Sequence, residues 1–160
     1  MSAIATKTPF CIRPALAADA AGLLQLMREL AAFEAYLDAF RVTEQDLLTR
    51  GLDTEHPQFK AYVAATTSGE LLGYSVLVEI AFTYDLRPDW RLKELYVSAP
   101  VRQLGVGKAL MLHIVDEARQ HGCGRLKWDV LPDNSYAKRF YRQFGGEPVT
   151  DWEAWILPFD

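Results

Sequence analysis

A short loop with two glycines, between an expected strand and an expected helix, places the strongest constraint on this chain. The loop reads Arg102-Gln103-Leu104-Gly105-Val106-Gly107 and follows the apolar segment 92–97. Glycine lets a backbone turn tightly and approach a ligand closely. The helix that begins here directs its unpaired amides and the positive end of its dipole at the loop. The segment therefore predicts an anion site, for which a pyrophosphate is the natural occupant, with Arg102 and Lys108 adding positive charge.

Three other interpretations of this loop make different demands on the sequence. A Gly-x-Gly pair can be only a tight turn that starts a helix. A Walker A loop needs a glycine five residues before Gly107 and a serine or threonine after the lysine, where this chain has Arg102 and Ala109. A Rossmann loop needs a third glycine where this chain has Leu110. The sequence disfavours both nucleotide-binding loops and leaves the simple turn open.

The apolar periodicity predicts one α/β domain over residues 1–160, with helices around a single mixed sheet. Strands are expected over 10–14, 60–66, 71–84, 92–97, 125–131 and 152–157. Helices are expected from an Asp19 cap to about 36, from a capping box at 43–46 to about Gly51, over 107–122, and from Asp133 or Asn134 to Gly145-Gly146. The order is β-α-α-β-β-β-α-β-α-β. The strands at 92–97 and 125–131 flank a helix, so they are expected to be parallel neighbours.

The loop and the strand before it resemble a known cofactor motif. Arg-x-x-Gly-x-Gly after Leu95-Tyr96-Val97 is similar to the acetyl-CoA motif of the GNAT superfamily of N-acetyltransferases. The resemblance implies the GNAT fold, with acetyl-CoA as co-substrate. It also implies that the loop amides of Arg102, Gln103, Leu104, Gly105, Val106, Gly107 and Lys108 hold the pyrophosphate. The strand would carry a bulge, and its backbone amides at Leu95, Tyr96 and Val97 would meet the acetyl carbonyl and the pantetheine arm.

The expected last helix carries a candidate general acid. Asn134, Ala137 and Tyr141 are spaced i, i+3 and i+7, so they share one helix face. A departing thiolate needs a proton, and a phenol with a pKa near 10 can supply it to a thiol whose pKa is about 8.5. The GNAT resemblance implies that Tyr141 lies beside the CoA sulfur and that this face, including Asn134 at the pantetheine arm, binds the cofactor. The alternative is that Tyr141 is an ordinary core aromatic.

Further segments resemble the diamine acetyltransferases within that superfamily, namely 12–15, 28–34, 43–48 and 82–85. This resemblance implies a primary amine of a small molecule, a diamine or an amino-acid-like compound, as acceptor, and a homodimer. A bound ammonium must lose a proton before it attacks the thioester, and Glu94 is the candidate base. By resemblance, Glu34 would bind a cationic acceptor. The alternative for both glutamates is a solvated surface charge.

One departure from the diamine enzymes bears on the acceptor. Their acidic pair reads Lys93-Glu94 here, and a lysine beside the acceptor repels a polycation and favours a substrate with its own carboxylate. The aromatic Tyr84 is a further candidate for the acceptor pocket, although packing explains it equally well. Two other functions stay open: acetylation of a protein or peptide amine, and a non-catalytic acyl-CoA-binding sensor.

The composition removes several classes of function. The formal net charge is −4, which argues against nucleic acid as the main partner. The apolar runs are shorter than the roughly 20 residues that span a bilayer, so no membrane association is expected. The three histidines have no metal-ligand spacing, and no metal is expected. A cytoplasmic location is the default expectation.

Overall fold

The computed structural model describes residues 8–160, which fall into two compact units. The first unit ends at Trp128, and the second is Asp129–Asp160. The single domain expected over residues 1–160 stays a prediction.

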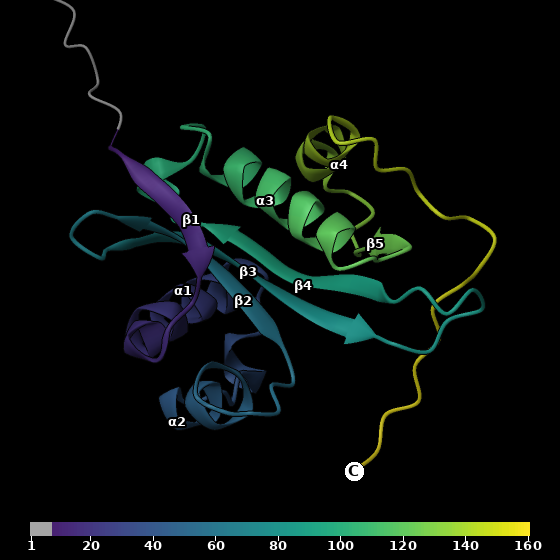
Figure 1. Ribbon diagram of the computed structural model, residues 1–160. Helices are drawn as coiled ribbons and strands as arrows, with labels where there is room; N and C mark the ends of the chain where they lie inside the picture. The colour runs from purple at the N-terminus through teal and green to yellow at the C-terminus, as the bar shows by residue number, and fades with distance from the viewer. Residues whose placement is uncertain (1–7) are drawn as a thin grey trace, which may run out of the picture. The chain divides into compact units, whose positions relative to one another are not determined.

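The first unit is built on one five-stranded sheet in the order β1-β2-β3-β4-β5 (Figure 1). Its strands are β1 (Phe10–Pro14), β2 (Lys60–Thr66), β3 (Leu71–Ile80), β4 (Asp89–Val97) and β5 (Arg125–Lys127). The first four strands pair antiparallel, whereas β4 and β5 are parallel. The expected mixed sheet, and the parallel pair around a helix, are confirmed.

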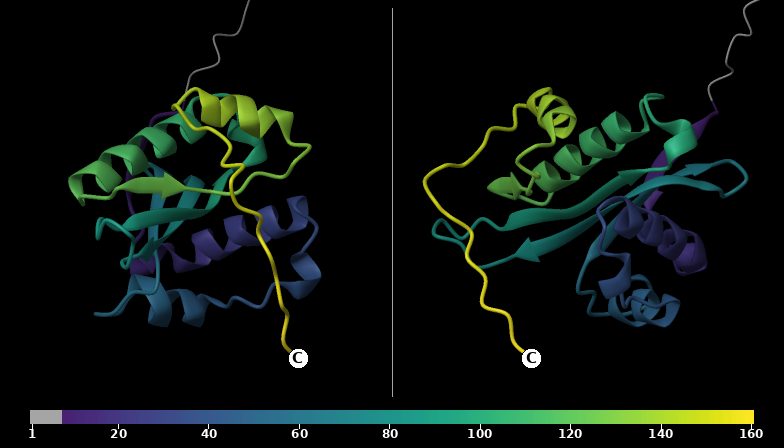
Figure 2. Two further views of the ribbon diagram at one scale, coloured as in Figure 1. Left: turned by 90° about the vertical axis from the view of Figure 1, so that its right-hand side faces the viewer. Right: turned by 180° about the vertical axis from the view of Figure 1, so that it is seen from behind.

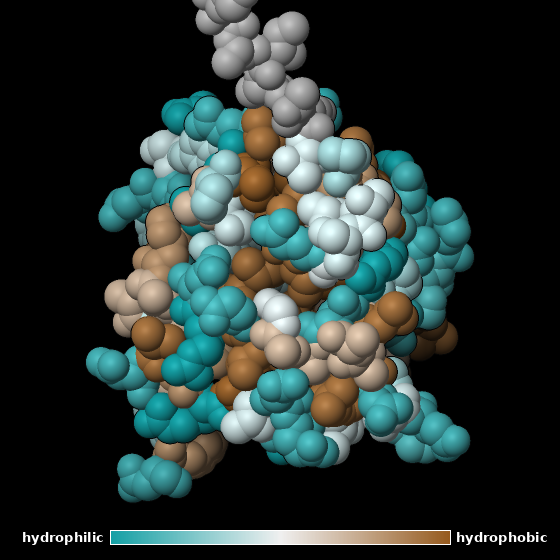
Figure 3. All heavy atoms as spheres, turned by 90° about the vertical axis from the view of Figure 1, so that its left-hand side faces the viewer, coloured by the Kyte–Doolittle hydropathy of each residue, from teal (hydrophilic) through white to brown (hydrophobic). Residues whose placement is uncertain are grey.

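Helices cover both faces of this sheet (Figure 2). Helix α1 (Ala20–Phe33) and the short α2 (Glu44–Leu47) lie on one face, and α3 (Val106–Gln120) lies on the other. Each long helix buries an apolar stripe, because residues three or four apart share a face. The buried side chains are Leu23, Met27 and Leu30 in α1, and Leu110, Met111 and Ile114 in α3. At the end of the molecule where β1 lies, hydrophobic side chains form small patches between polar ones (Figure 3).

The start of α2 follows its sequence signal, whereas the start of α1 does not. At α2, Thr43 Oγ1 accepts from the Asp46 amide at 3.1 Å, and Asp46 Oδ2 accepts from the Thr43 amide at 2.9 Å. This reciprocal pair is the expected capping box. At α1, the side chain of Asp19 makes no capping bond. Its carboxylate instead accepts from the Leu16 amide and from both terminal nitrogens of Arg13 in β1. These bonds occupy the side chain that was expected to cap α1.

The chain after α2 continues as one wide turn of π-helix, Leu48–Leu52. Gly51 is required here, because a Cβ atom at this position would lie 2.2 Å from Cζ of Phe59. The turn and the Phe59 ring therefore pack in direct contact.

Two expected strands are shorter in the structure than in the sequence pattern, and a third is absent. Strand β3 ends at Ile80 rather than at Tyr84, and β5 ends at Lys127 rather than at Leu131. The strand expected over 152–157 is wrong, because these residues form no strand and their aromatic and aliphatic side chains are exposed. Alternation of apolar residues marks a segment that can pair, but only a neighbouring strand supplies the hydrogen bonds.

The second unit contains one helix, α4 (Ser135–Arg142). Of the two expected caps, Asn134 is the one used, since its Oδ1 accepts from the Ala137 amide at 3.0 Å. Gly145, with φ at +85°, follows the helix, and the Gly146 amide bonds the Tyr141 carbonyl. Gly145-Gly146 therefore ends the helix as expected.

Candidate active site

A bulge in β4 decides which face of the sheet receives Glu94. Leu92 pairs with Leu77, but Glu94 pairs with Val76, so Lys93 is an extra residue without a partner on β3. An extra residue reverses the alternation of side chains beyond it. Before the bulge, the Trp90 ring packs against His121 at the end of α3, on one face. After it, Glu94 shares the α1 face with Val76.

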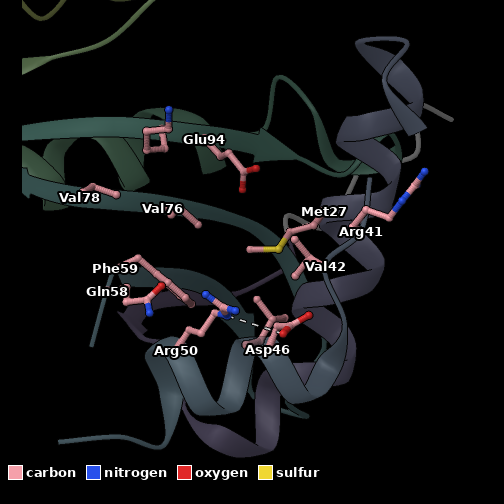
Figure 4. A pocket seen from close by; sticks show the side chains of 12 residues that line it. Met27, Arg41, Val42, Asp46, Arg50, Gln58, Phe59, Val76, Val78 and Glu94 are labelled. Carbon is pink, nitrogen blue, oxygen red and sulfur yellow. Dashed lines mark ion pairs between the residues drawn. The ribbon is translucent and has the colours of Figure 1, made fainter. Parts of the chain in front are cut away.

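Glu94 opens into a cleft on this face, with a volume of about 500 Å³ (Figure 4). That volume is within the range of small-molecule sites, roughly 300–1,000 Å³. The floor is apolar and the walls carry charges of both signs. The lining residues are Met27, Arg41, Val42, Asp46, Leu47, Arg50, Gln58, Phe59, Val76, Val78, Lys93 and Glu94.

The surroundings of Glu94 raise the pKa of its carboxyl above the ordinary value. Burial raises the pKa of Glu94, the phenol of Tyr74 lowers it, and the charge of Glu34 raises it again. Burial, with the charges of Glu94 and Glu34, also raises the pKa of Tyr36 to about 12. The Tyr74 hydroxyl is buried and makes no hydrogen bond of ordinary geometry with a described residue. Two carboxyls and two phenols therefore influence one another at this end of the sheet.

The structure thus brings together Lys93 and Glu94, which line the cleft, and the exposed Glu34, which acts on Glu94 through its charge. Sequence reasoning missed Tyr36 and Tyr74. Tyr74 lies within an apolar strand, where a core role is the default interpretation, and Tyr36 follows the end of α1 without a motif. Neither position carries a sequence signal that separates it from ordinary packing.

Tyr84 lies outside this cleft. It follows β3, and its hydroxyl accepts from Arg125 Nη1 at 2.9 Å, while the Arg125 guanidinium stacks 4.6 Å from its ring centre. Arg125 also pairs with Asp85 and Asp89, so the group fixes β5 against the end of the β3–β4 hairpin. These contacts attach Tyr84 to Arg125, and its expected role in acceptor binding stays a prediction.

The glycine loop has the backbone of an anion site. Gly105, the N-cap of α3, has φ of +87°, in the left-handed region that glycine adopts without strain, and it supplies no capping side chain. The amides in the first turn of α3, which includes Val106, Gly107 and Lys108, have no acceptor within the helix. The glycine turn lies at the N-terminus of α3 as expected, and its binding of a pyrophosphate stays a prediction.

The Arg102 side chain already has partners within the protein. Its Nε donates to the Val97 carbonyl at 3.0 Å, and its guanidinium lies 5.2 Å from the Phe33 ring centre and 5.4 Å from that of Tyr96. These contacts join the loop to the end of β4 and to α1. Lys108, by contrast, is exposed in the first turn of α3.

The last residues of β4 leave one backbone edge open. The pairing of β4 with β5 ends at Arg91, whereas its pairing with β3 continues to Val97. On the β5 side, Leu95, Tyr96 and Val97 therefore have no strand partner among the described residues. The Tyr96 side chain itself is buried, and its hydroxyl donates to Glu29 at 3.2 Å. The side chains of Leu95 and Val97 are half-buried, and the Val97 carbonyl accepts from Arg102.

The remaining site residues lie in the second unit. Asn134, Ala137 and Tyr141 belong to α4 and its cap, with the Asn134 oxygen committed to the Ala137 amide. Their roles toward CoA stay predictions.

Among residues 8–160, no three His, Cys, Asp or Glu side chains are grouped as metal ligands would be. Within the same residues, no helix combines the length and the apolar character needed to cross a bilayer.

Comparison with known proteins identifies the family. The model of the acetyltransferase (GNAT) family matches residues 24–145. Thialysine N-epsilon-acetyltransferase of Bos taurus is 30% identical over 151 residues, which cover 90% of this chain and 88% of that protein. The human spermidine/spermine N(1)-acetyltransferase-like protein 1 is 28% identical over 153 residues, 92% of this chain and 22% of that protein.

The solved structure of an integron cassette protein from the mobile metagenome of V. cholerae superposes with a TM-score of 0.78 at 23% identity, covering 94% of this chain and 93% of that one. The matches confirm the resemblance found in the motifs and the GNAT fold expected from it. The chain therefore belongs to the acetyltransferase (GNAT) family, and it is an N-acetyltransferase.

Proposed function

We propose that the protein transfers an acetyl group from acetyl-CoA to a primary amine of a small molecule. The observation that carries this proposal is the position of Glu94, a carboxyl of raised pKa that lines a cleft of small-molecule size. Glu94 belongs to β4, the strand that precedes the glycine loop. The names of the relatives support it, since they specify thialysine and spermidine or spermine.

The α3 N-terminus is the part of the first unit that fits a CoA pyrophosphate. Its first-turn amides lack helical acceptors, and Gly105 leaves them uncovered by any capping side chain. In the proposal, the amides from Arg102 to Lys108 hold the phosphates, and the open backbone edge at Leu95 to Val97 holds the pantetheine arm. Acetyl-CoA, when bound, supplies the acetyl group as a thioester whose cleavage leaves a thiolate.

The proposed catalytic groups manage two proton transfers. Glu94 takes one proton from the acceptor ammonium, so that the nitrogen lone pair becomes available for attack. Tyr141 gives its phenolic proton to the sulfur that leaves. The nitrogen forms one bond to the acetyl carbon and gives up a second proton, so the overall reaction releases one proton to the medium. Asn134 and Ala137 complete the cofactor face of α4 in this proposal.

We also propose a homodimer. Besides the subfamily resemblance, the C-terminal residues support it, because Trp152, Trp155, Ile156 and Phe159 are each more than 80% exposed. Large apolar side chains in one segment are commonly covered by a partner. Light scattering at micromolar concentration should give twice the 18.1 kDa of one chain. A mass of one chain would contradict the dimer. A cytoplasmic location, where acetyl-CoA is available, belongs to the same proposal and is tested by cell fractionation.

The experiment that tests the function is a thiol-release assay with acetyl-CoA and a panel of polyamines, amino acids and aminoglycosides. We expect thiol release above the hydrolytic background with at least one small primary amine. Binding of CoA by calorimetry without release for any amine would instead favour the sensor. Release only with peptide or protein amines would favour the other alternative.

A further inference from the structure

The cleft below β4 carries opposite charges on opposite walls. Glu94 points into it from the sheet, and Arg50 points into it from the π-helical turn after α2 (Figure 4). The surfaces between them are apolar, with Met27, Val76 and Phe59. An occupant that satisfies both walls has a positive end, a negative end and an apolar middle.

Of the two arginines on the cleft, Arg50 is the one that can bind a ligand. Arg41 donates to the carbonyls of Asp38 at 2.6 Å and of Phe40 at 3.1 Å, and its side chain extends away from the cleft (Figure 4). Arg50 meets only Asp46, through Nε at 3.6 Å, and the two side chains are 59% and 38% exposed. A loose, exposed pair four residues apart on a helix contributes little. Its two terminal nitrogens have no partner among the described residues and match a carboxylate in geometry.

The backbone that carries Arg50 is held in place. The Gln58 amide donates to the Arg50 carbonyl at 2.7 Å, and Gly51 packs directly on the Phe59 ring. Gln58 and Phe59 also line the cleft, so both segments that meet at Arg50 belong to its wall. A side chain anchored in this way keeps a fixed starting point for binding.

We propose that the acceptor is a zwitterionic amino acid whose side chain ends in a primary amine. Arg50 binds its α-carboxylate, the apolar floor contacts its methylenes, and Glu94 receives its terminal ammonium. Lys93 adds positive charge to the same cleft. A diamine without a carboxylate leaves Arg50 unneutralised and brings a second cation toward it, which disfavours that acceptor. This inference rests on the proposed function.

The test compares two acceptors of equal chain length, L-lysine and 1,5-diaminopentane, which is lysine without its carboxylate. In the wild type, we expect kcat/KM to be higher for lysine. Arg50→Gln should lower kcat/KM for lysine by roughly 10- to 100-fold, the effect of losing a charge-assisted pair. The same variant should leave 1,5-diaminopentane unchanged or improve it. Arg119→Gln removes an equal charge from an exposed position on α3, on the other face of the sheet, and should change neither.

A second arm removes the charge from the substrate and needs no variant. With the wild type, L-lysine methyl ester should show a loss similar to that of the Arg50→Gln variant with lysine. Equal kcat/KM for lysine, its ester and 1,5-diaminopentane, or an equal effect of Arg50→Gln on all three, would overturn the inference while the acetyltransferase activity stands. If the wild type acetylates no small amine at all, the proposed function itself fails.

Discussion

Replacing Glu94 by glutamine removes the proposed base while it keeps the shape of the side chain in the cleft. The acceptor ammonium has an ordinary pKa near 10.4, so at pH 7 only about one molecule in 2,500 is the reactive free amine. A base that delivered the free amine in every bound complex could recover at most about that factor. Since general bases contribute roughly 10²–10⁴-fold, we expect kcat/KM of Glu94→Gln to fall by about 10²–10³ at pH 7.

The deficit should depend on pH in a defined way. The variant relies on free amine from solution, which rises tenfold per pH unit below pH 10, whereas the wild type is level above the pKa of Glu94. The ratio of wild type to variant in the thiol-release assay should therefore shrink about tenfold per unit from pH 7 to pH 9. A deficit that stays constant with pH, or one below about tenfold at pH 7, would refute the role of Glu94 as base.

One further variant tests the pKa of Glu94, and the melting temperature of Glu94→Gln separates a loss of chemistry from a loss of folding. Because Glu34 helps to raise the pKa of Glu94, Glu34→Gln should move the acid limb of kcat/KM to lower pH. A raised carboxyl pKa contributes stability at low pH, and that stability is lost as pH rises through the folded-state value. Glu94→Gln removes this loss, so at pH 7 the variant should melt at or above the wild-type temperature. A lower melting temperature would mean that the variant loses activity through unfolding.

Three further substitutions test other parts of the molecule. Tyr141→Phe should lower kcat by roughly 10²–10⁴-fold with CoA affinity unchanged in calorimetry, and a retained kcat would mean that another group donates the proton. Gly107→Asp puts a negative charge at the α3 N-terminus and should abolish most CoA binding in a folded protein, whereas unchanged affinity would contradict the phosphate site. Gly51→Ala places a Cβ atom 2.2 Å from the Phe59 ring and should destabilise the fold by roughly 1–3 kcal/mol in thermal unfolding. A wild-type melting temperature would show that the ring moves freely.

Signals contained within four residues were read correctly from the sequence. The capping box at Thr43 and the cap at Asn134 both join a side-chain oxygen to an amide three residues later, so no distant partner is involved. Asp19 looks equally suited to cap α1, but Arg13 of β1 takes its carboxylate. The segment 152–157 has the composition of a strand and no strand beside it. Where a structure depends on a partner from elsewhere in the chain, the local pattern could not decide it.

Some residues of the candidate site could likewise be predicted from the sequence, and others could not. The glycine loop and Glu94 follow from their order along the chain, whereas the cleft residues Arg50 and Phe59 come from a segment more than 30 residues earlier. The association of Tyr36 and Tyr74 with Glu94 depends on the bulge at Lys93, which sets the face that Glu94 occupies. A count of alternating residues places Glu94 on the face of Trp90, and one extra residue reverses that result.

The bulge at Lys93 also bears on how this enzyme could change its acceptor during evolution. Most positions in a sheet are constrained by a residue opposite, so a new side chain there costs stability. Lys93 has no residue opposite and is exposed, yet it lies on the wall of the cleft. A mutation at this codon can invert the charge that an incoming amine meets while the hydrogen-bonded ladder on both sides stays intact. Substrate preference can therefore drift at this single position without selection for compensating changes in the core.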